Sequence, residues 1–179
     1  MDSARKLSHT SVMLHWVVGI LMIGSLIFGT ILEEMPRSPD KGFLVGLHIS
    51  FGLIVLIFAL WRVTHRLRQG MLEPLGNVSA TQKKVGRFVM GFLLFGTLLM
   101  PISGILMQLG EGRAIAFFGL ELIAASGVEN EIIEKIGEVG HGLGSKLMIL
   151  AVALHIAAAL KHHFIDKDGT MTRMLGKHV

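Results

Sequence analysis

Long apolar runs without Asp, Glu, Lys or Arg mark out this chain of 179 residues. Three runs, 7–32, 42–61 and 88–110, carry no charge, and a fourth, 139–160, is interrupted only by Lys146. A helix needs about 20 mainly apolar residues to cross the hydrocarbon core of a bilayer. The pattern therefore predicts an all-α fold, an integral membrane four-helix bundle in which residues 1–179 form a single domain. The spans are expected at about 12–32, 42–62, 88–109 and 140–162.

Composition agrees with the membrane class, since 51% of the residues are hydrophobic and 17% are charged, outside the usual range of soluble domains. The first run is about twice as long as the apolar core of a signal peptide and no A-x-A site follows it, so we expect it to remain as a span. The chain has no cysteine, which excludes disulfides, thiolate-held iron–sulfur clusters and covalent haem attachment. Any redox cofactor must be held without thiols.

Basic residues are distributed unevenly between the two sides of the predicted membrane. Twelve of the seventeen belong to the N-terminus, the second connection and the C-terminal tail: Arg5, Lys6, Arg62, Arg66, Arg68, Lys83, Lys84, Arg87, Lys161, Lys167, Arg173 and Lys177. The connection 111–138 instead carries six Glu against Arg113 and Lys135. The positive-inside rule therefore predicts a multi-pass membrane protein with both termini in the cytoplasm.

Two further expectations concern the connections. Membrane lipid headgroups are the expected partner of the inner positive charge. No basic segment is interleaved with aromatic residues, so we do not expect a nucleic acid partner. The third connection is long enough for a short surface helix, which we place near 129–139 on the outer face.

Four histidines lie inside or at the edge of the apolar segments: His15, His48, His141 and His155. Ionisable residues in spans are rare and usually functional. His15 and His155 lie near the predicted cytoplasmic ends of their helices, and His48 and His141 near the outer ends. The fourteen residues from His141 to His155 correspond to about 21 Å of helix and return to within roughly 40° of the same face. The sequence therefore predicts two pairs at matching depths.

Each pair offers one imidazole from each of two helices, which is the donor set of a haem iron with two axial histidines. Zinc would need three or four clustered ligands, and the HExxH pattern is absent. A carboxylate-bridged di-iron centre would need acids in the core. We therefore predict two non-covalent b-type haems, an inner one held by His15 and His155 and an outer one held by His48 and His141. Two filled axial positions favour electron transfer over oxygen chemistry.

Other interpretations of the same residues stay open at this point. Membrane histidines can also pack or hydrogen-bond, which would make the chain a non-redox scaffold. Gly19 and Gly52, one turn beyond His15 and His48, suit close helix packing as well as they leave room for a flat macrocycle. Eleven methionines leave His–Met ligation open, although packing is the commoner role of Met.

Several motifs resemble the prokaryotic di-haem cytochrome b-561 family over nearly the whole chain. The segment LHW at 14–16 is similar to its first-helix ligand motif, and HISFG from His48, with Arg62 closing the helix, is similar to the second. The segment LHIAAALKHHF at 154–164, followed by KDGTMTRM, resembles the fourth-helix signature and is the most specific match. One departure is Arg87, where relatives can have a histidine. The third helix supplies no ligand in this interpretation.

The resemblance implies an oxidoreductase of the bacterial inner membrane that exchanges electrons with membrane quinone. Some members oxidise superoxide outside and reduce ubiquinone inside. His162 and Lys161 would then lie near the quinone. The acidic outer connections argue against an anionic donor, although Arg37, Lys41 and Lys146 can form a local positive mouth. Lys146 can instead snorkel to headgroups or pair with a haem propionate.

An alternative function is a haem-bearing anchor subunit that links a partner oxidoreductase to quinone. Such a subunit would co-purify with its partner and show little activity alone. The electron donor therefore stays open between a small molecule such as superoxide and a protein.

Overall fold

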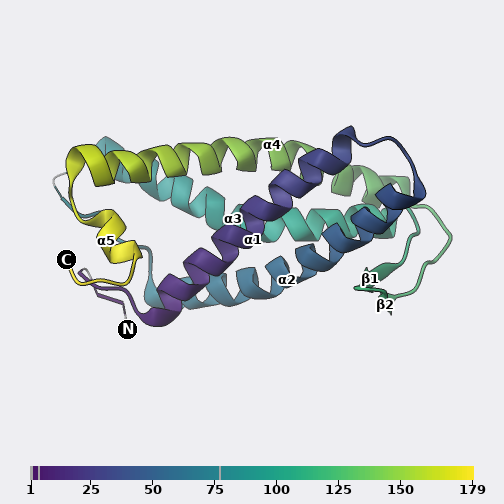
Figure 1. Ribbon diagram of the computed structural model, residues 1–179, viewed down its shortest axis with the longest axis horizontal. Helices are drawn as coiled ribbons and strands as arrows, with labels where there is room; N and C mark the ends of the chain where they lie inside the picture. Colours follow the sequence, from purple (N-terminus) through teal and green to yellow (C-terminus); the bar gives the residue numbers. More distant parts are fainter. Residues whose placement is uncertain (1, 4, 77) are drawn as a thin grey trace.

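Four long antiparallel helices form an elongated bundle in the computed structural model, which describes residues 2, 3, 5–76 and 78–179 (Figure 1). The helices are α1 (His9–Glu34), α2 (Pro39–Gln69), α3 (Ala80–Gly110) and α4 (Glu131–Lys161). The two termini lie at the same end of the bundle, which we call the terminal end. The strands β1 (Ile115–Phe117) and β2 (Leu120–Ile123) lie at the opposite, hairpin end.

The helices begin where side chains can accept the otherwise unpaired backbone N–H groups of a first turn. Ser8, Ser38, Ser79 and Asn130 each accept a hydrogen bond from the backbone N–H three residues later. Gln82 completes a capping box with Ser79, so two orphan donors of α3 are satisfied reciprocally. Each cap of this kind stabilises a helix by about 1 kcal/mol.

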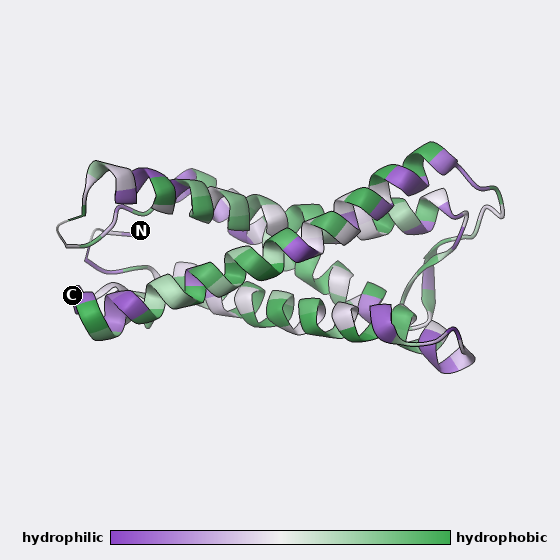
Figure 2. Ribbon diagram, turned by 90° about the horizontal axis from the view of Figure 1, so that it is seen from above, coloured by the Kyte–Doolittle hydropathy of each residue, from purple (hydrophilic) through white to green (hydrophobic). Residues whose placement is uncertain are grey.

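All four long helices are long and apolar enough to cross a membrane. Large apolar side chains face outward from the bundle, among them Ile20 (66% exposed), Ile57 (64%) and Phe95 (60%). Figure 2 shows hydrophobic residues along the helices and more hydrophilic ones toward the ends of the bundle. Such a surface requires a hydrocarbon environment, so the predicted all-α membrane bundle is confirmed.

Glycine contacts bring α3 and α4 into close antiparallel packing. A Cβ added to Gly140 would lie 3.1 Å from Ser103 Cβ, and one added to Gly144 would lie 3.2 Å from Met100 Sδ. A Cβ on Gly137 would overlap the α3 backbone at Met107. Small residues at such spacing allow helix backbones to approach in a membrane. This seam fixes the position of α4 on either side of His141.

The surface helix expected near 129–139 is wrong. Residues from Glu131 onward form the first turns of α4, because Gly137 and Gly140 pack on α3 and continue its seam. Glu131 and Glu134 lie in the first turn, where negative charge complements the positive N-terminal end of the helix dipole. The pattern of hydrophobic residues alone could not distinguish the polar first turns of α4 from an independent surface helix.

The connection between α3 and α4 contains a short β-hairpin that the sequence did not predict. Its turn uses two left-handed residues, Phe118 (φ 47°) and Gly119 (φ 88°), as a tight hairpin turn requires. Phe118 N–H donates to Ser50 Oγ at 2.9 Å. The hairpin is thereby attached to α2 two residues beyond His48.

Candidate functional site

The structure places the four predicted histidines in two facing pairs on α4 and its neighbours. The ring centroids of His48 (α2) and His141 (α4) are 6.1 Å apart, with an interplanar angle of 86°. Those of His15 (α1) and His155 (α4) are 6.2 Å apart, with an angle of 60°. By the directions of the helices, the first pair lies in the hairpin half of the bundle and the second in the terminal half. We call them the hairpin-end pair and the terminal-end pair.

These separations are compatible with a metal ion between the two imidazoles of each pair. A metal–imidazole bond is about 2 Å long and the bonded nitrogen lies about 1.1 Å from the ring centre, so two trans ligands have centroids about 6.2 Å apart. The donor set in each pair fits a haem iron held by two axial histidines.

The backbone of α3 orients His141. Its Nδ1 lies 2.9 Å from the Met100 carbonyl oxygen, and a carbonyl can only accept, so Nδ1 carries the proton. The neutral ring then presents the unprotonated Nε2 for a metal. Ser103 Oγ, which donates to the same carbonyl at 3.0 Å, lies 3.3 Å from Nδ1 and shares its proton.

Glycines leave space for both rings of the hairpin-end pair. A Cβ on Gly104 would lie 3.1 Å from His141 Cε1, and one on Gly29 would lie 3.3 Å from His48 Cε1. The buried Nδ1 of His48 has no hydrogen-bond partner in the part of the chain that the structure describes. A buried imidazole that the polypeptide alone does not satisfy fits a site for a non-protein group.

Side chains rather than backbone surround the terminal-end pair. Arg62 Nη2 on α2 lies 3.2 Å from His15 Nδ1, and the Trp16 ring stands edge-on to His15 at 5.2 Å. The Trp16 indole N–H donates to the Met174 carbonyl at 2.9 Å. This bond attaches the short helix α5 (Thr170–Met174) to α1 beside His15.

Open space adjoins the two glycines that the sequence placed one turn from ligands. A Cβ added at Gly19 or Gly52 would meet no atom within 4 Å. This space accommodates a flat macrocycle at those positions, although other glycines such as Gly46 also face open space.

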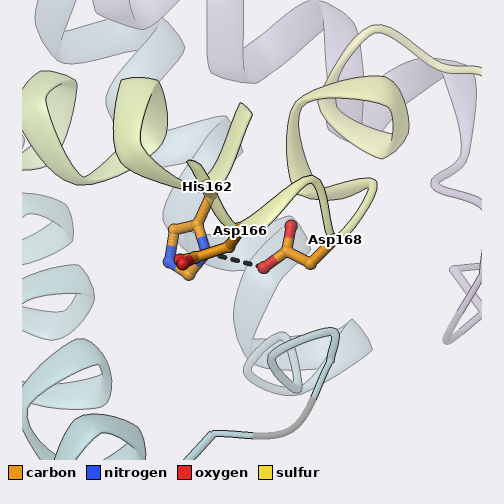
Figure 3. Close-up of side chains that lie close together, drawn as sticks. All are labelled: His162, Asp166 and Asp168. Atoms are coloured by element: carbon orange, nitrogen blue, oxygen red, sulfur yellow. Dashed lines mark hydrogen bonds and ion pairs between the residues drawn. The ribbon is translucent and has the colours of Figure 1, made fainter. Parts of the chain in front are cut away.

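The residues expected near a quinone lie in one cluster at the terminal end, on the π-helical turn η1 (His162–Asp166) and its flanks (Figure 3). His162 Nδ1 is 2.6 Å from Asp168 Oδ2 and 3.3 Å from Asp166 Oδ2. Lys161 Nζ donates to both Asp166 oxygens, at 2.6 and 2.7 Å. Two carboxylates and an imidazole could hold a metal ion, but the Lys161 ammonium already compensates Asp166.

Asp168 is the buried acid of this cluster, with a side chain only 8% exposed. Burial raises the pKa of Asp168, but hydrogen bonds from Thr170 and His162 lower it by more, so the pKa lies below its usual range. The carboxylate is therefore ionised at neutral pH and can orient the His162 ring through Nδ1.

Ion pairs neutralise two basic residues at the hairpin end, Arg113 in the α3–α4 connection and Lys135 near the start of α4. Arg113 lies 2.9 Å from Glu111 and Lys135 lies 2.8 Å from Glu138. Lys41 Nζ donates to the Met35 carbonyl at 2.6 Å. Lys146 is exposed on α4. The positive mouth expected from Arg37, Lys41 and Lys146 stays a prediction.

Two residues of the site appeared in the sequence only as parts of motifs. Arg62 closes the second motif and Asp168 lies within KDGTMTRM, and neither was given a role. A basic residue that closes an apolar run could have drawn attention to Arg62. The Met100 carbonyl left no signal, because backbone acceptors are the same at every residue. Arg87, noted as a departure, pairs with Glu73 at 2.7 Å away from either histidine pair.

Comparison with known proteins gives consistent matches across the whole chain. A family model described as prokaryotic cytochrome b561 matches residues 7–177. "Cytochrome b561 homolog 2" of Escherichia coli is 29% identical over 91% of this chain and 87% of its own length. "Probable superoxide oxidase CybB" of Yersinia pestis is 27% identical over 97% of each chain. "Cytochrome b562" of Cereibacter sphaeroides is 29% identical over 90% of each chain.

Proposed function

This chain belongs to the prokaryotic cytochrome b561 family, and we propose that it carries electrons across a membrane through two b-type haems. The resemblance expected from the sequence is confirmed. The chain is thus a multi-pass bacterial membrane protein of a haem family that transfers electrons. The proposal of two haems rests on the two histidine pairs, with ring centroids 6.1 and 6.2 Å apart.

In this proposal the chain's own residues fix two redox positions at different depths. His48 and His141 hold one iron, and His15 and His155 hold the other. Haem supplies reversible one-electron chemistry at each position. If the two histidines of a pair bind the iron, no position is left at which oxygen or water could bind. The fourteen residues between the α4 histidines separate the two positions by about 21 Å, so together they bridge most of the hydrocarbon core.

The terminal end faces the cytoplasm of the inner membrane in this proposal. The bias of Lys and Arg toward the termini and the α2–α3 connection supports that orientation. The hairpin end then faces the periplasmic side. Electrons enter at the hairpin-end pair and leave at the terminal-end pair.

The proposed acceptor is ubiquinone in the bilayer near Lys161 and His162. Reduction of a quinone to a quinol takes up two electrons and two protons. His162 lies at the surface of the terminal end and is held by the ionised Asp168, so it can pass solvent protons to a quinone oxygen. Lys161 can stabilise the negative charge that develops on that oxygen.

Superoxide is the proposed electron donor, in line with the name of the Yersinia pestis relative. Two superoxide anions would give up one electron each and leave as two dioxygen molecules. The acidic surface at the hairpin end favours a second candidate, in which a basic partner protein docks there and the chain acts as its membrane anchor. Stable co-purification of a partner and little activity alone would support this second candidate.

A reduced-minus-oxidised spectrum with haem quantified per chain tests the central proposal. We expect two b-type haems per purified chain. A correctly folded, colourless preparation would contradict both redox functions and support a non-redox scaffold. One haem per chain would contradict the two-site arrangement.

The donor is tested by mixing the oxidised protein with superoxide and following haem reduction, then adding ubiquinone. Rapid reduction followed by reoxidation supports the superoxide:quinone reaction. Reduction by added quinol, with no response to superoxide, would instead support the anchor function. Lys161→Ala and His162→Ala should slow only the quinone phase, whereas the exposed Lys167→Ala serves as a control from the same end of the chain.

A further inference from the structure

Arg62 is a guanidinium placed at the terminal end of the α1–α2 interface beside a proposed haem ligand. Its Nη2 lies 3.2 Å from His15 Nδ1 in a part-buried position. Arg66, one turn further along α2, pairs with Asp2 at 3.0 Å. Within the residues that the structure describes, no comparable ion pair with a carboxylate is found for Arg62. Partly buried cations normally have an anionic partner.

The contact between Arg62 and His15 is incompatible with metal ligation by His15. A guanidinium carries only donors, so His15 Nδ1 must accept, and the proton of the neutral ring then lies on Nε2. If Nε2 bound iron, Nδ1 would carry the proton. If Nδ1 bound iron, its lone pair would be used. In neither case can Nδ1 accept from Arg62, which must turn to another acceptor.

Haem b brings two such acceptors with it, its propionate carboxylates. Arginine binds carboxylates well because its planar fork can make two parallel charge-assisted hydrogen bonds. We propose that Arg62 is the propionate-binding residue of the terminal-end haem site, exchanging its bond to His15 for a bond to a haem carboxylate. This inference rests on the proposed function, since it requires that His15 and His155 hold a haem.

The exchange has a consequence for electron transfer. An unpaired propionate near the iron stabilises the oxidised haem, and a paired one does so less. Charge near the centre and hydrogen bonding are among the factors by which proteins set haem potentials, and their effect is large at low local dielectric. Arg62 therefore raises the potential of the terminal-end haem above the value that it would have with an unpaired propionate.

The test is a potentiometric titration of both haems in wild type, Arg62→Gln and Arg62→Lys. In Arg62→Gln we expect the reduced-to-oxidised ratio of one haem to fall roughly tenfold at a fixed applied potential. This corresponds to a midpoint potential lower by about 59 mV for one electron. The affected haem should be the one missing from His155→Ala. Arg62→Lys should keep most of the wild-type potential. Arg68→Gln, an exposed cation on the same helix, is the matched control and should leave both potentials unchanged.

Reconstitution with haem whose propionates are methyl esters separates carboxylate binding from a structural role. With this haem, wild type and Arg62→Gln should retain the terminal-end haem equally well, because Arg62 has no carboxylate left to bind. Stronger retention of the ester by wild type than by Arg62→Gln would overturn the proposal, as would unchanged potentials in Arg62→Gln with ordinary haem. If Arg62→Gln loses the terminal-end haem, wild type must retain the ester more weakly than ordinary haem at that site; equal retention overturns it.

The wild-type spectrum keeps this inference distinct from the function on which it rests. Absence of haem from wild type would refute the proposed function. If wild type binds two haems and neither potential changes when Arg62 is substituted, the proposed function stands and only the role of Arg62 is refuted.

Discussion

The two histidine pairs have nearly the same separation but are held in different ways. At the hairpin end, the backbone carbonyl of Met100 sets the tautomer of His141, and Gly29 and Gly104 leave space for the rings. At the terminal end, the side chain of Arg62 contacts His15. The packing of α3 and α4 therefore already holds His141 of the hairpin-end pair in the tautomer that a metal requires. The terminal-end pair needs a rearrangement of Arg62 before it can bind one.

This difference predicts different sensitivities to substitution. A site shaped by backbone and glycine is disturbed when atoms are added. Removing a side chain disturbs it little, because the backbone carbonyl stays in place. A site shaped by side chains is disturbed when atoms or charges are removed.

Removal of a histidine should eliminate one haem and spare the other. His48→Ala is expected to retain one haem, at the terminal end, and His155→Ala to retain one at the hairpin end, because each iron loses an axial ligand. Haem per chain and the two midpoint potentials provide the measurement. Loss of the same haem in both variants would contradict the pairing, and retention of both haems would contradict ligation by these residues.

Addition of one methyl group should weaken the hairpin-end site alone. In Gly104→Ala the new Cβ would lie 3.1 Å from His141 Cε1, so the ring must shift away from its position. We expect haem affinity at that site to fall about tenfold, a cost of roughly 1.4 kcal/mol. Competitive transfer of haem to an apo-acceptor measures it.

Gly91→Ala is the matched control for this substitution. It lies on the same helix, and its Cβ would meet nothing within 4 Å. Both variants gain about 1 kcal/mol of helix propensity, so their difference isolates the contact with His141. Equal haem affinities in the two variants would show that the glycine has no part in shaping the site.

The sequence predicted the four helices because hydrocarbon imposes a length and a composition that charge-free runs display directly. All four expected spans fall on the observed helices, except that residue 162 already belongs to η1. The hairpin was not predicted, since its short strands depend on the bond from Phe118 to Ser50 of α2. The start of α4 was misassigned because its polar first turns are held by glycine packing, which leaves no hydrophobic period.

The positions of the site histidines could be predicted more fully than their surroundings. Depth and helical angle sufficed to pair His141 with His48, because both follow from counting residues along regular helices. The roles of Arg62 and of the Met100 carbonyl depend on how side chains and backbones of different helices meet. That information arises only from packing in three dimensions.

The terminal end should also show an acid-dependent contribution to stability. Burial raises the pKa of Asp2, but hydrogen bonds from Ser11 and Ser8 and the charge of Arg66 outweigh it and lower the pKa from 3.8 to about 2. A carboxyl with a lowered folded-state pKa stabilises the fold above its unfolded pKa and loses that contribution as pH falls toward the folded value.

Asp2→Asn should therefore reduce the free energy of unfolding by about 1–2 kcal/mol at pH 7. The difference from wild type should shrink between pH 4 and pH 2, as the wild-type carboxyl becomes protonated. Denaturant unfolding in detergent across this range measures it. A difference that is constant with pH would mean that the carboxylate charge does not anchor the N-terminal segment.

Removal of the Ser103 hydroxyl should have the smallest effect, although Ser103 lies beside a proposed ligand. Its Oγ already donates to the Met100 carbonyl at 3.0 Å, so it can only share the His141 Nδ1 proton, which the carbonyl accepts at 2.9 Å. In Ser103→Ala the carbonyl keeps that proton and the ring keeps its tautomer. We expect full haem occupancy and a change of less than about twofold in the reduced-to-oxidised ratio, well below the roughly tenfold effect of Arg62→Gln. A larger effect for Ser103→Ala than for Arg62→Gln would reverse the contrast between a backbone-held and a side-chain-held site.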